Sequence, residues 1–161
     1  MAKLPQWSVF WGQYYDYINF TSPYVKEMIG GAVNASWITN TCAIRMSYAM
    51  NYIGFPIPKG FPNLNTIKGG DGMRYSFRVR ELRPWLRHTF GAPDFEVTKK
   101  ANEAFDRKQI ESMLGLIAFD INFKDATGHL DATFNGTFSS EGNISKDYFA
   151  LATKVSIWKC A

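Results

Sequence analysis

The sequence has few cysteines, no long apolar run and no dense run of one charge, and each lack excludes a class of protein. Two cysteines among 161 residues, Cys42 and Cys160, are too few for a disulfide framework or for a zinc site of four thiolates. The richest apolar run, residues 114–119, is shorter than the roughly 18 residues of a membrane helix. The basic residues are scattered rather than grouped, unlike those of a surface that tracks nucleic-acid phosphates. We therefore expect neither a membrane nor a nucleic acid as a partner.

What the chain does contain is enough apolar material for one packed core. Its 161 residues are 46% hydrophobic and 20% charged, which predicts a single domain over residues 1–161. The formal charge of +4 mildly favours anionic partners, among them cell-wall polymer. Residues 1–5 lack the charged region and apolar stretch that begin a cleaved signal peptide. A cytosolic protein, a trimmed mature form and a protein exported without a cleaved signal all remain open.

The first part of the chain carries helical patterns. Apolar residues recur every three or four positions from Trp7 to Ile18, which predicts one face of an amphipathic helix. A proline near its start and two glycines at its end predict a short helix over Pro23–Ile29. A third helix is predicted over Cys42–Tyr52, which contains neither proline nor glycine. A fourth is predicted over Glu81–Phe90, where Pro84 limits the start of the first turn.

The last third of the chain changes to strand-like runs that are separated by turn residues. The pair Asn135-Gly136 tolerates the positive φ angles of a type I′ turn and predicts a hairpin. Residues 55–72 are rich in Pro, Gly and Asn and are expected to form a long surface loop. Alternation and β-branched or aromatic residues predict strands over residues 75–79, 114–122, 128–134 and 152–159. Helices that precede an antiparallel sheet make an α+β fold.

Cys42 lies where a thiol becomes reactive. Either Asn40 or Thr41 is a suitable N-cap, so Cys42 falls in the first turn of its predicted helix. The positive end of the helix dipole and the unpaired amides there favour the thiolate. The same amides, that of Cys42 included, can receive the oxyanion of an attacked carbonyl. A lone cysteine at a helix start is more often a small buried residue, and a bridge to Cys160 in an oxidising compartment also remains open.

A nucleophilic cysteine needs a base, and the chain has only two histidines. His88 lies late in a predicted helix, where a cation suits the C-terminal end of the dipole, so we interpret it as structural. His129 opens a predicted strand, a rigid element that can hold an imidazole against a thiolate. We therefore predict that Cys42 and His129 meet as nucleophile and base at the mouth of a groove.

Two carboxylates compete to orient the imidazole and fix its tautomer. Asp131 lies on the same strand face as His129, while Glu141 lies on the returning arm of the hairpin. If Asn135-Gly136 is a strict two-residue turn, Asp131 pairs with Ser140 and Glu141 points to the opposite face. A three-residue bulged turn would instead bring both carboxylates beside the imidazole. The spacing leaves both arrangements open.

No other motif competes with the Cys42/His129 pair. The chain has no phosphate-binding loop, no metalloprotease helix pair and no serine elbow. Its glycine-rich segment, residues 69–72, is too short and lacks a strand-to-helix context. We expect neither a metal nor a cofactor.

Residues 40–51, NTCAIRMSYAMN, resemble the nucleophile helix of the fourth family of type VI secretion amidase effectors. Further similarity, in the family's order and over most of the chain, lies in Ile29–Gly31, Tyr75–Val79, His88–Gly91, Gly128-His129 and Asn135-Gly136. The resemblance implies a papain-like fold of the NlpC type, and a toxin that the type VI apparatus secretes without a cleaved signal and that acts in a rival's periplasm. It implies cleavage of the bond between D-glutamate and meso-diaminopimelate in peptidoglycan stem peptides. It also implies a cognate immunity protein that plugs the cleft.

The resemblance also implies roles for residues. Cys42 matches the nucleophile and His129 matches the base. The third member of that family's site is an aspartate on the strand after the hairpin, and counting from the turn glycine, Gly136, leads to Glu141. The preceding segment is longer than the family's usual form, which accommodates a bulge, so we name Glu141 first and Asp131 second. The altered third member leaves open a non-catalytic domain that binds the cell wall or a partner, and a related amidase or acyltransferase of another specificity is a further alternative.

Overall fold

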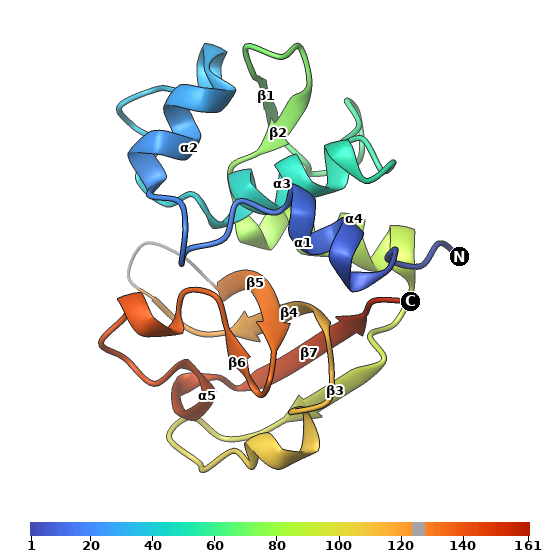
Figure 1. Cartoon of the computed structure of the whole chain (residues 1–161), viewed down its shortest axis with the longest axis vertical. Coiled ribbons are helices and arrows are strands. Elements are labelled where there is room, and N and C mark those ends of the chain that lie inside the picture. Colours follow the sequence, from blue (N-terminus) through green and yellow to red (C-terminus); the bar gives the residue numbers. More distant parts are fainter. Residues whose placement is uncertain (124–127) are drawn as a thin grey trace.

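The computed structural model describes residues 1–123 and 128–161, which form a helical part and a sheet (Figure 1). The helices are α1 (Trp7–Gln13), α2 (Ser22–Ile29), α3 (Cys42–Tyr52), α4 (Val79–Phe90) and α5 (Tyr148–Leu151), with 3-10 turns at Gly31–Val33, Arg107–Gln109 and Glu141–Asn143. The strands are β1 (Thr66–Lys68), β2 (Arg74–Ser76), β3 (Phe95–Thr98), β4 (Gly115–Asp120), β5 (Gly128–Phe134), β6 (Thr137–Phe138) and β7 (Lys154–Lys159). In Figure 1, α1 to α4 and the β1–β2 ribbon lie above the sheet that the other strands form.

The sheet has the strand order β3-β7-β4-β5-β6, and every neighbouring pair is antiparallel. Successive side chains of β4 point to opposite faces. Leu116 and Ala118 belong to the apolar cluster that includes the helices α1, α3 and α4, whereas Ile117 and Phe119 pack with Phe149 of α5. The sheet is therefore covered on both faces, and the prediction of an α+β fold with helices packed on a C-terminal antiparallel sheet is confirmed.

Helix α1 is shorter than predicted. It ends at Gln13, and Ile18, which the periodicity placed on the buried face, is 62% exposed. Beyond the helix, the carboxylate of Asp16 accepts hydrogen bonds from two following backbone N–H groups. The carbonyls of Tyr15 and Asp16 accept hydrogen bonds from Arg45. Because side chains satisfy backbone groups that a continuing helix would use, the chain leaves the helix, and the prediction is wrong beyond Gln13.

Two further segments differ from the sequence prediction. Strand β1 lies inside residues 55–72, which were expected to be loop, and it pairs with β2. The predicted strand over residues 75–79 ends at Ser76, because Val79 is already the first residue of α4 and is buried. Pro84 consequently lies inside α4 rather than at its start. Strand β3 and helix α5 were not predicted.

The hairpin between β5 and β6 has the predicted turn. Asn135 and Gly136 both have positive φ, 52° and 74°, and Phe134 pairs directly with Thr137. This is the strict two-residue turn, and the bulged alternative is wrong. Strand β5 and helix α3 also have the predicted bounds.

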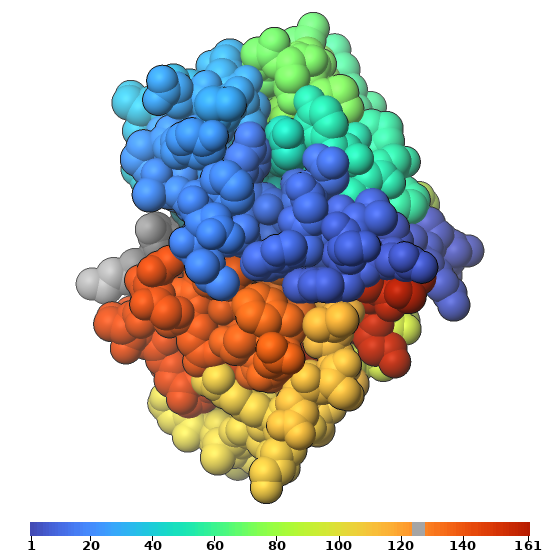
Figure 2. All heavy atoms as spheres, viewed as in Figure 1, coloured from blue at the N-terminus to red at the C-terminus, as the bar shows by residue number. Residues whose placement is uncertain are grey.

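The N-terminal segment joins the helical part to the sheet. Leu4 forms a parallel bridge with Cys160, so the two ends of the chain lie side by side (Figure 1). In Figure 2 the dark blue N-terminal segment lies across the boundary between the helical part and the orange hairpin segment. Within residues 1–123 and 128–161, no helix has the length and apolar character needed to cross a membrane.

Candidate active site

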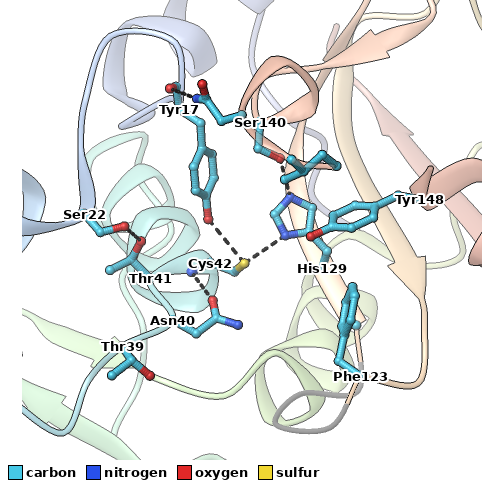
Figure 3. A pocket seen from close by; sticks show the side chains of 13 residues that line it. Tyr17, Ser22, Thr39, Asn40, Thr41, Cys42, Phe123, His129, Ser140 and Tyr148 are labelled. Atoms are coloured by element: carbon cyan, nitrogen blue, oxygen red, sulfur yellow. Dashed lines mark hydrogen bonds between the residues drawn. The ribbon is translucent and has the colours of Figure 1, made fainter. Parts of the chain in front are cut away.

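Cys42 and His129 meet, as the sequence predicted. The Cys42 Sγ lies 2.8 Å from the His129 Nδ1, and each residue is 4% exposed. Figure 3 shows the Cys42 sulfur in direct contact with the His129 imidazole, and both residues line a pocket. Both cysteines are free thiols, so the alternative of a bridge to Cys160 is wrong for this structure.

At the start of α3, the backbone amide of Cys42 also has a hydrogen-bond partner. The Cys42 N–H donates to the Asn40 Oδ1 at 3.0 Å, so Asn40 is the residue whose side chain caps the helix. Thr41 occupies the N-cap position without a capping hydrogen bond, and its hydroxyl accepts from Arg45 instead. The Cys42 amide, which the sequence predicted as free for an oxyanion, is therefore engaged by an exposed side chain. A substrate oxygen has to replace the Asn40 oxygen to reach this amide.

The sulfur and the imidazole shift each other's protonation. Burial alone would raise the pKa of the Cys42 thiol, but the charge and hydrogen bond of His129, with a hydrogen bond from Tyr17, lower that pKa below its usual value. Burial would lower the pKa of His129, whereas the Cys42 thiolate and Asp131 raise it to about 10. Opposite shifts of this kind favour the proton on the imidazole over the proton on the sulfur. Cys42 and His129 therefore titrate as one coupled unit, in which the thiolate–imidazolium form is favoured.

Asp131 binds the other ring nitrogen. Its Oδ2 lies 2.9 Å from the His129 Nε2, and its side chain is fully buried. The Oδ1 accepts from the hydroxyls of Tyr14 at 3.0 Å and Ser139 at 2.6 Å, and the Oδ2 accepts from the amide of Ser140 at 3.1 Å. Burial would raise the pKa of Asp131. The hydrogen bond and charge of His129, together with hydrogen bonds from Ser139 and Ser140, lower this pKa below its usual value. Asp131 is thus an ionised carboxylate at the far side of the ring.

Glu141, which was named first for this place, lies elsewhere. Because the turn has two residues, the chain arrives at Ser140 opposite Asp131 and then turns into the 3-10 segment that begins at Glu141. The Glu141 carboxylate forms an ion pair with Arg107, at 2.5 Å and 2.8 Å, and accepts from Thr137. The prediction that Glu141 orients the imidazole is wrong, and the second choice, Asp131, makes that contact.

Three residues at the site were not predicted. The Tyr17 hydroxyl donates to the Cys42 Sγ at 3.2 Å, and the Ser140 hydroxyl lies 3.0 Å from the His129 Nε2. Arg45 is 1% exposed, and its guanidinium lies 3.7 Å from the centroid of the Tyr17 ring. Local spacing carried no signal for Tyr17. The two-residue turn option, which paired Ser140 with Asp131, was a signal for Ser140.

Arg45 organises the segment that carries Tyr17. Its guanidinium donates to the backbone carbonyls of Tyr15, Asp16 and Phe20 at 2.8–3.0 Å. A buried cation is stable only when such acceptors replace water. The segment after α1 is therefore wrapped around Arg45, one helical turn beyond Cys42.

The pocket in front of the sulfur has a volume of about 310 Å³, which is within the size range of small-ligand sites. Its lining comes from α3 and the residues before it, from the Tyr17 segment and from the sheet side: Tyr17, Asn40, Cys42, Phe123, His129 and Tyr148 are among these residues (Figure 3). In the described part of the chain, no group of three or more His, Cys, Asp or Glu side chains is placed to hold a metal ion. The groups positioned for chemistry are the sulfur of Cys42, the imidazole of His129 and the carboxylate of Asp131.

Comparisons with known proteins show similarity to one family over most of the chain. The model of the family described as type VI secretion system (T6SS), amidase effector protein 4 (Tae4) matches residues 38–158. The effector in a crystal structure of the Tae4-Tai4 effector-immunity complex from Enterobacter cloacae is 27% identical, with a TM-score of 0.82 over 98% of this chain and 99% of that chain. The effector in a Tae4/Tai4 structure from Salmonella typhimurium is 25% identical, with a TM-score of 0.83 over the same shares.

The crystal structure of Tae4 alone from Enterobacter cloacae is 27% identical and has a TM-score of 0.79 over the full length of both chains. No curated protein matches the chain by sequence. The fold is the papain-like, NlpC-type α+β fold that the resemblance implied.

Proposed function

This chain belongs to the amidase effector 4 family of the type VI secretion system, and on that premise we propose that it hydrolyses the D-glutamate–meso-diaminopimelate bond of peptidoglycan stem peptides. The observation that carries the proposal is the 2.8 Å contact between the Cys42 Sγ and the His129 Nδ1 at a pocket of about 310 Å³. A thiolate paired with an imidazolium is a nucleophile suited to an amide carbonyl. The bond named here is the one that the family resemblance implies.

In the proposed reaction, the Cys42 thiolate attacks the amide carbonyl and forms a tetrahedral intermediate. The His129 imidazolium then gives its Nδ1 proton to the departing amine, which leaves a thioester on Cys42. Water, deprotonated by the now neutral imidazole, hydrolyses the thioester and restores the thiolate and imidazolium. Asp131 stays ionised throughout and stabilises the charged ring, since it binds Nε2 at 2.9 Å.

The oxyanion of the intermediate needs donors near the start of α3. The Asn40 Oδ1 lies 3.0 Å from the Cys42 amide nitrogen and marks where an oxyanion would accept from that amide. Asn40 is exposed, so its side chain can rotate away when a substrate enters. The positive end of the helix dipole adds to the stabilisation of negative charge there.

The partners follow from the same premise. Effectors similar to this chain are found in complexes with the immunity protein Tai4. We therefore propose a cognate immunity protein that covers the pocket, delivery by the type VI secretion apparatus without a cleaved signal peptide, and action on peptidoglycan in the periplasm of the target bacterium.

The test is digestion of purified peptidoglycan with analysis of the soluble fragments by mass spectrometry. We expect fragments cut between D-glutamate and meso-diaminopimelate. Cys42→Ala should abolish their release, and His129→Ala should lower the rate by roughly a hundred to ten thousand fold because general acid-base help is lost.

The chain offers a matched control for each variant. Cys160→Ala and His88→Ala remove the other thiol and the other imidazole and should keep near wild-type rates. Full activity of Cys42→Ala would refute the cysteine mechanism. Fragments of another mass would assign another bond, and retention on sacculi without soluble product would favour a binding domain.

A further inference from the structure

The Nε2 nitrogen of His129 has two oxygen neighbours rather than one. The Asp131 Oδ2 lies at 2.9 Å and the Ser140 Oγ at 3.0 Å. These two oxygens are themselves hydrogen-bonded, because the Ser140 hydroxyl donates to the Asp131 Oδ2 at 2.7 Å. The three groups close a triangle, and Asp131 and Ser140 are 0% and 2% exposed.

The ionised Asp131 and its short contact with Nε2 favour one arrangement of the hydrogens in this triangle. An ionised carboxylate only accepts, so the single hydroxyl proton of Ser140 goes to Asp131. The Ser140 oxygen therefore turns a lone pair toward the His129 ring, and the Nε2 hydrogen is shared between two acceptors. If Nε2 carried no hydrogen, its lone pair would face the carboxylate of Asp131 without a donor, at a distance where such contacts are costly when buried.

We infer that Ser140 is a positioning residue of the proposed amidase reaction: its hydroxyl fixes the tautomer and the rotation of the His129 ring through the shared Nε2 hydrogen. The inference rests on the proposed function for its effect on catalysis, but not for its effect on the ring. With Nε2 held as a donor, Nδ1 is the nitrogen that exchanges a proton with Cys42 and the substrate.

Ser139 provides a matched control. It is as buried as Ser140, at 2% exposure, and it also donates to Asp131, through the Oδ1 at 2.6 Å. Its hydroxyl oxygen accepts from the backbone N–H of Tyr17 rather than from the imidazole. Removing the Ser139 hydroxyl therefore tests the support of the carboxylate without the contact to the ring.

The experiment compares Ser140→Ala with Ser139→Ala in the full chain, each verified as folded by circular dichroism. For Ser140→Ala we expect kcat on a synthetic stem peptide to fall by about ten- to a hundredfold with an unchanged KM, since one hydrogen bond to a charged group is lost. Nitrogen-15 NMR of the His129 ring should show a changed Nε2–H signal. Ser139→Ala should leave that signal and KM in place, with a clearly smaller loss in kcat.

A Ser140→Thr variant, which keeps the hydroxyl, should retain the wild-type ring signal if it folds. An unchanged ring signal together with wild-type kcat in Ser140→Ala would overturn the inference, and so would equal losses in the Ser139 and Ser140 variants. If the wild-type chain cuts no peptidoglycan, the proposed function fails, but the ring signal and the alkylation rate of Cys42 with iodoacetamide still test Ser140.

Discussion

The two sides of the site, the start of α3 and the β5–β6 hairpin, are built by opposite means. Around the Cys42 backbone the partners are close in sequence: Asn40 caps its amide from two residues before, and Arg45 bonds Thr41 within one helical turn. Around His129 the ring binds Asp131, whose donors are Ser139 and Ser140 across the hairpin and Tyr14 from the segment after α1. The nucleophile is thus placed by local structure, and the orientation of the base is placed by strand register and tertiary packing.

The segment after α1 ties these two sides together. Tyr14 donates to Asp131 on the hairpin side, whereas the Tyr17 hydroxyl donates to Cys42 on the helix side. The Tyr17 amide also donates to the Ser139 hydroxyl oxygen. Arg45, one helical turn after Cys42, donates to the carbonyls of Tyr15 and Asp16 in this segment. Misplacing this segment should therefore disturb both sides, while changes within one side should leave the other intact.

The largest effect is expected from Asp131→Asn, which tests whether Asp131 rather than Glu141 orients the imidazole. It should lower kcat by roughly a hundred to ten thousand fold, because an amide stabilises neither the imidazolium nor the correct tautomer. The isosteric Glu141→Gln variant, whose side chain contacts Arg107 and Thr137, should remain within a few fold of wild type. Steady-state rates on a stem peptide decide between them, and the reverse ranking would restore Glu141 as the orienting residue.

The next effect is on stability. Arg45→Met leaves three buried or partly buried carbonyls without their donor and should lower the free energy of unfolding by about 2–4 kcal/mol. Arg107→Met removes a half-exposed ion pair with Glu141 and should cost less than about 1 kcal/mol. Urea unfolding followed by fluorescence measures both. Equal costs would show that the segment does not depend on Arg45.

The smallest effect is expected on the protonation of Cys42. Tyr17→Phe removes a donor that lowers the pKa of the thiol, so the pH midpoint of Cys42 alkylation should move upward. Tyr14→Phe, which acts on Asp131, should move it less. Iodoacetamide rates measured from pH 4 to 10 report this midpoint, and a downward shift in Tyr17→Phe would contradict the assigned hydrogen bond.

The contact between the Cys42 sulfur and the His129 imidazole makes the stability of the fold depend on pH. A lowered pKa of Cys42 in the folded state contributes stability that is present above the unfolded value and is lost as the pH falls through the folded value. The pKa of His129, raised to about 10, contributes stability that is complete below its ordinary value near 6.5 and is lost as the pH rises through about 10. Around neutral pH the contribution of His129 is therefore largely present, and it disappears as the pH approaches 10.

Much of the site was predictable because its signals are local. Cys42 was identified by a capped helix start, and His129 by the position of the chain's second histidine at a strand start. The choice between Asp131 and Glu141 was not predictable, because it depends on whether the turn holds two or three residues. Tyr17 was placed in a helix because the apolar spacing around it is helical. In the structure its amide donates to the Ser139 hydroxyl oxygen and its carbonyl accepts from the Asn143 side chain, so its backbone groups are bonded by distant side chains.

The α+β class, the helix that begins at Cys42, the strand from Gly128 that carries His129 and the turn at Asn135-Gly136 could all be predicted from the sequence. Each of these follows from propensity, capping or turn chemistry within a few residues. Three features could be seen only in the folded structure: that Asp131 is the carboxylate that contacts the imidazole, that Ser140 lies against the same ring nitrogen, and that Tyr17 reaches the sulfur. Those contacts join segments that are far apart in the chain or depend on hairpin register, so their geometry is set by packing rather than by local preference.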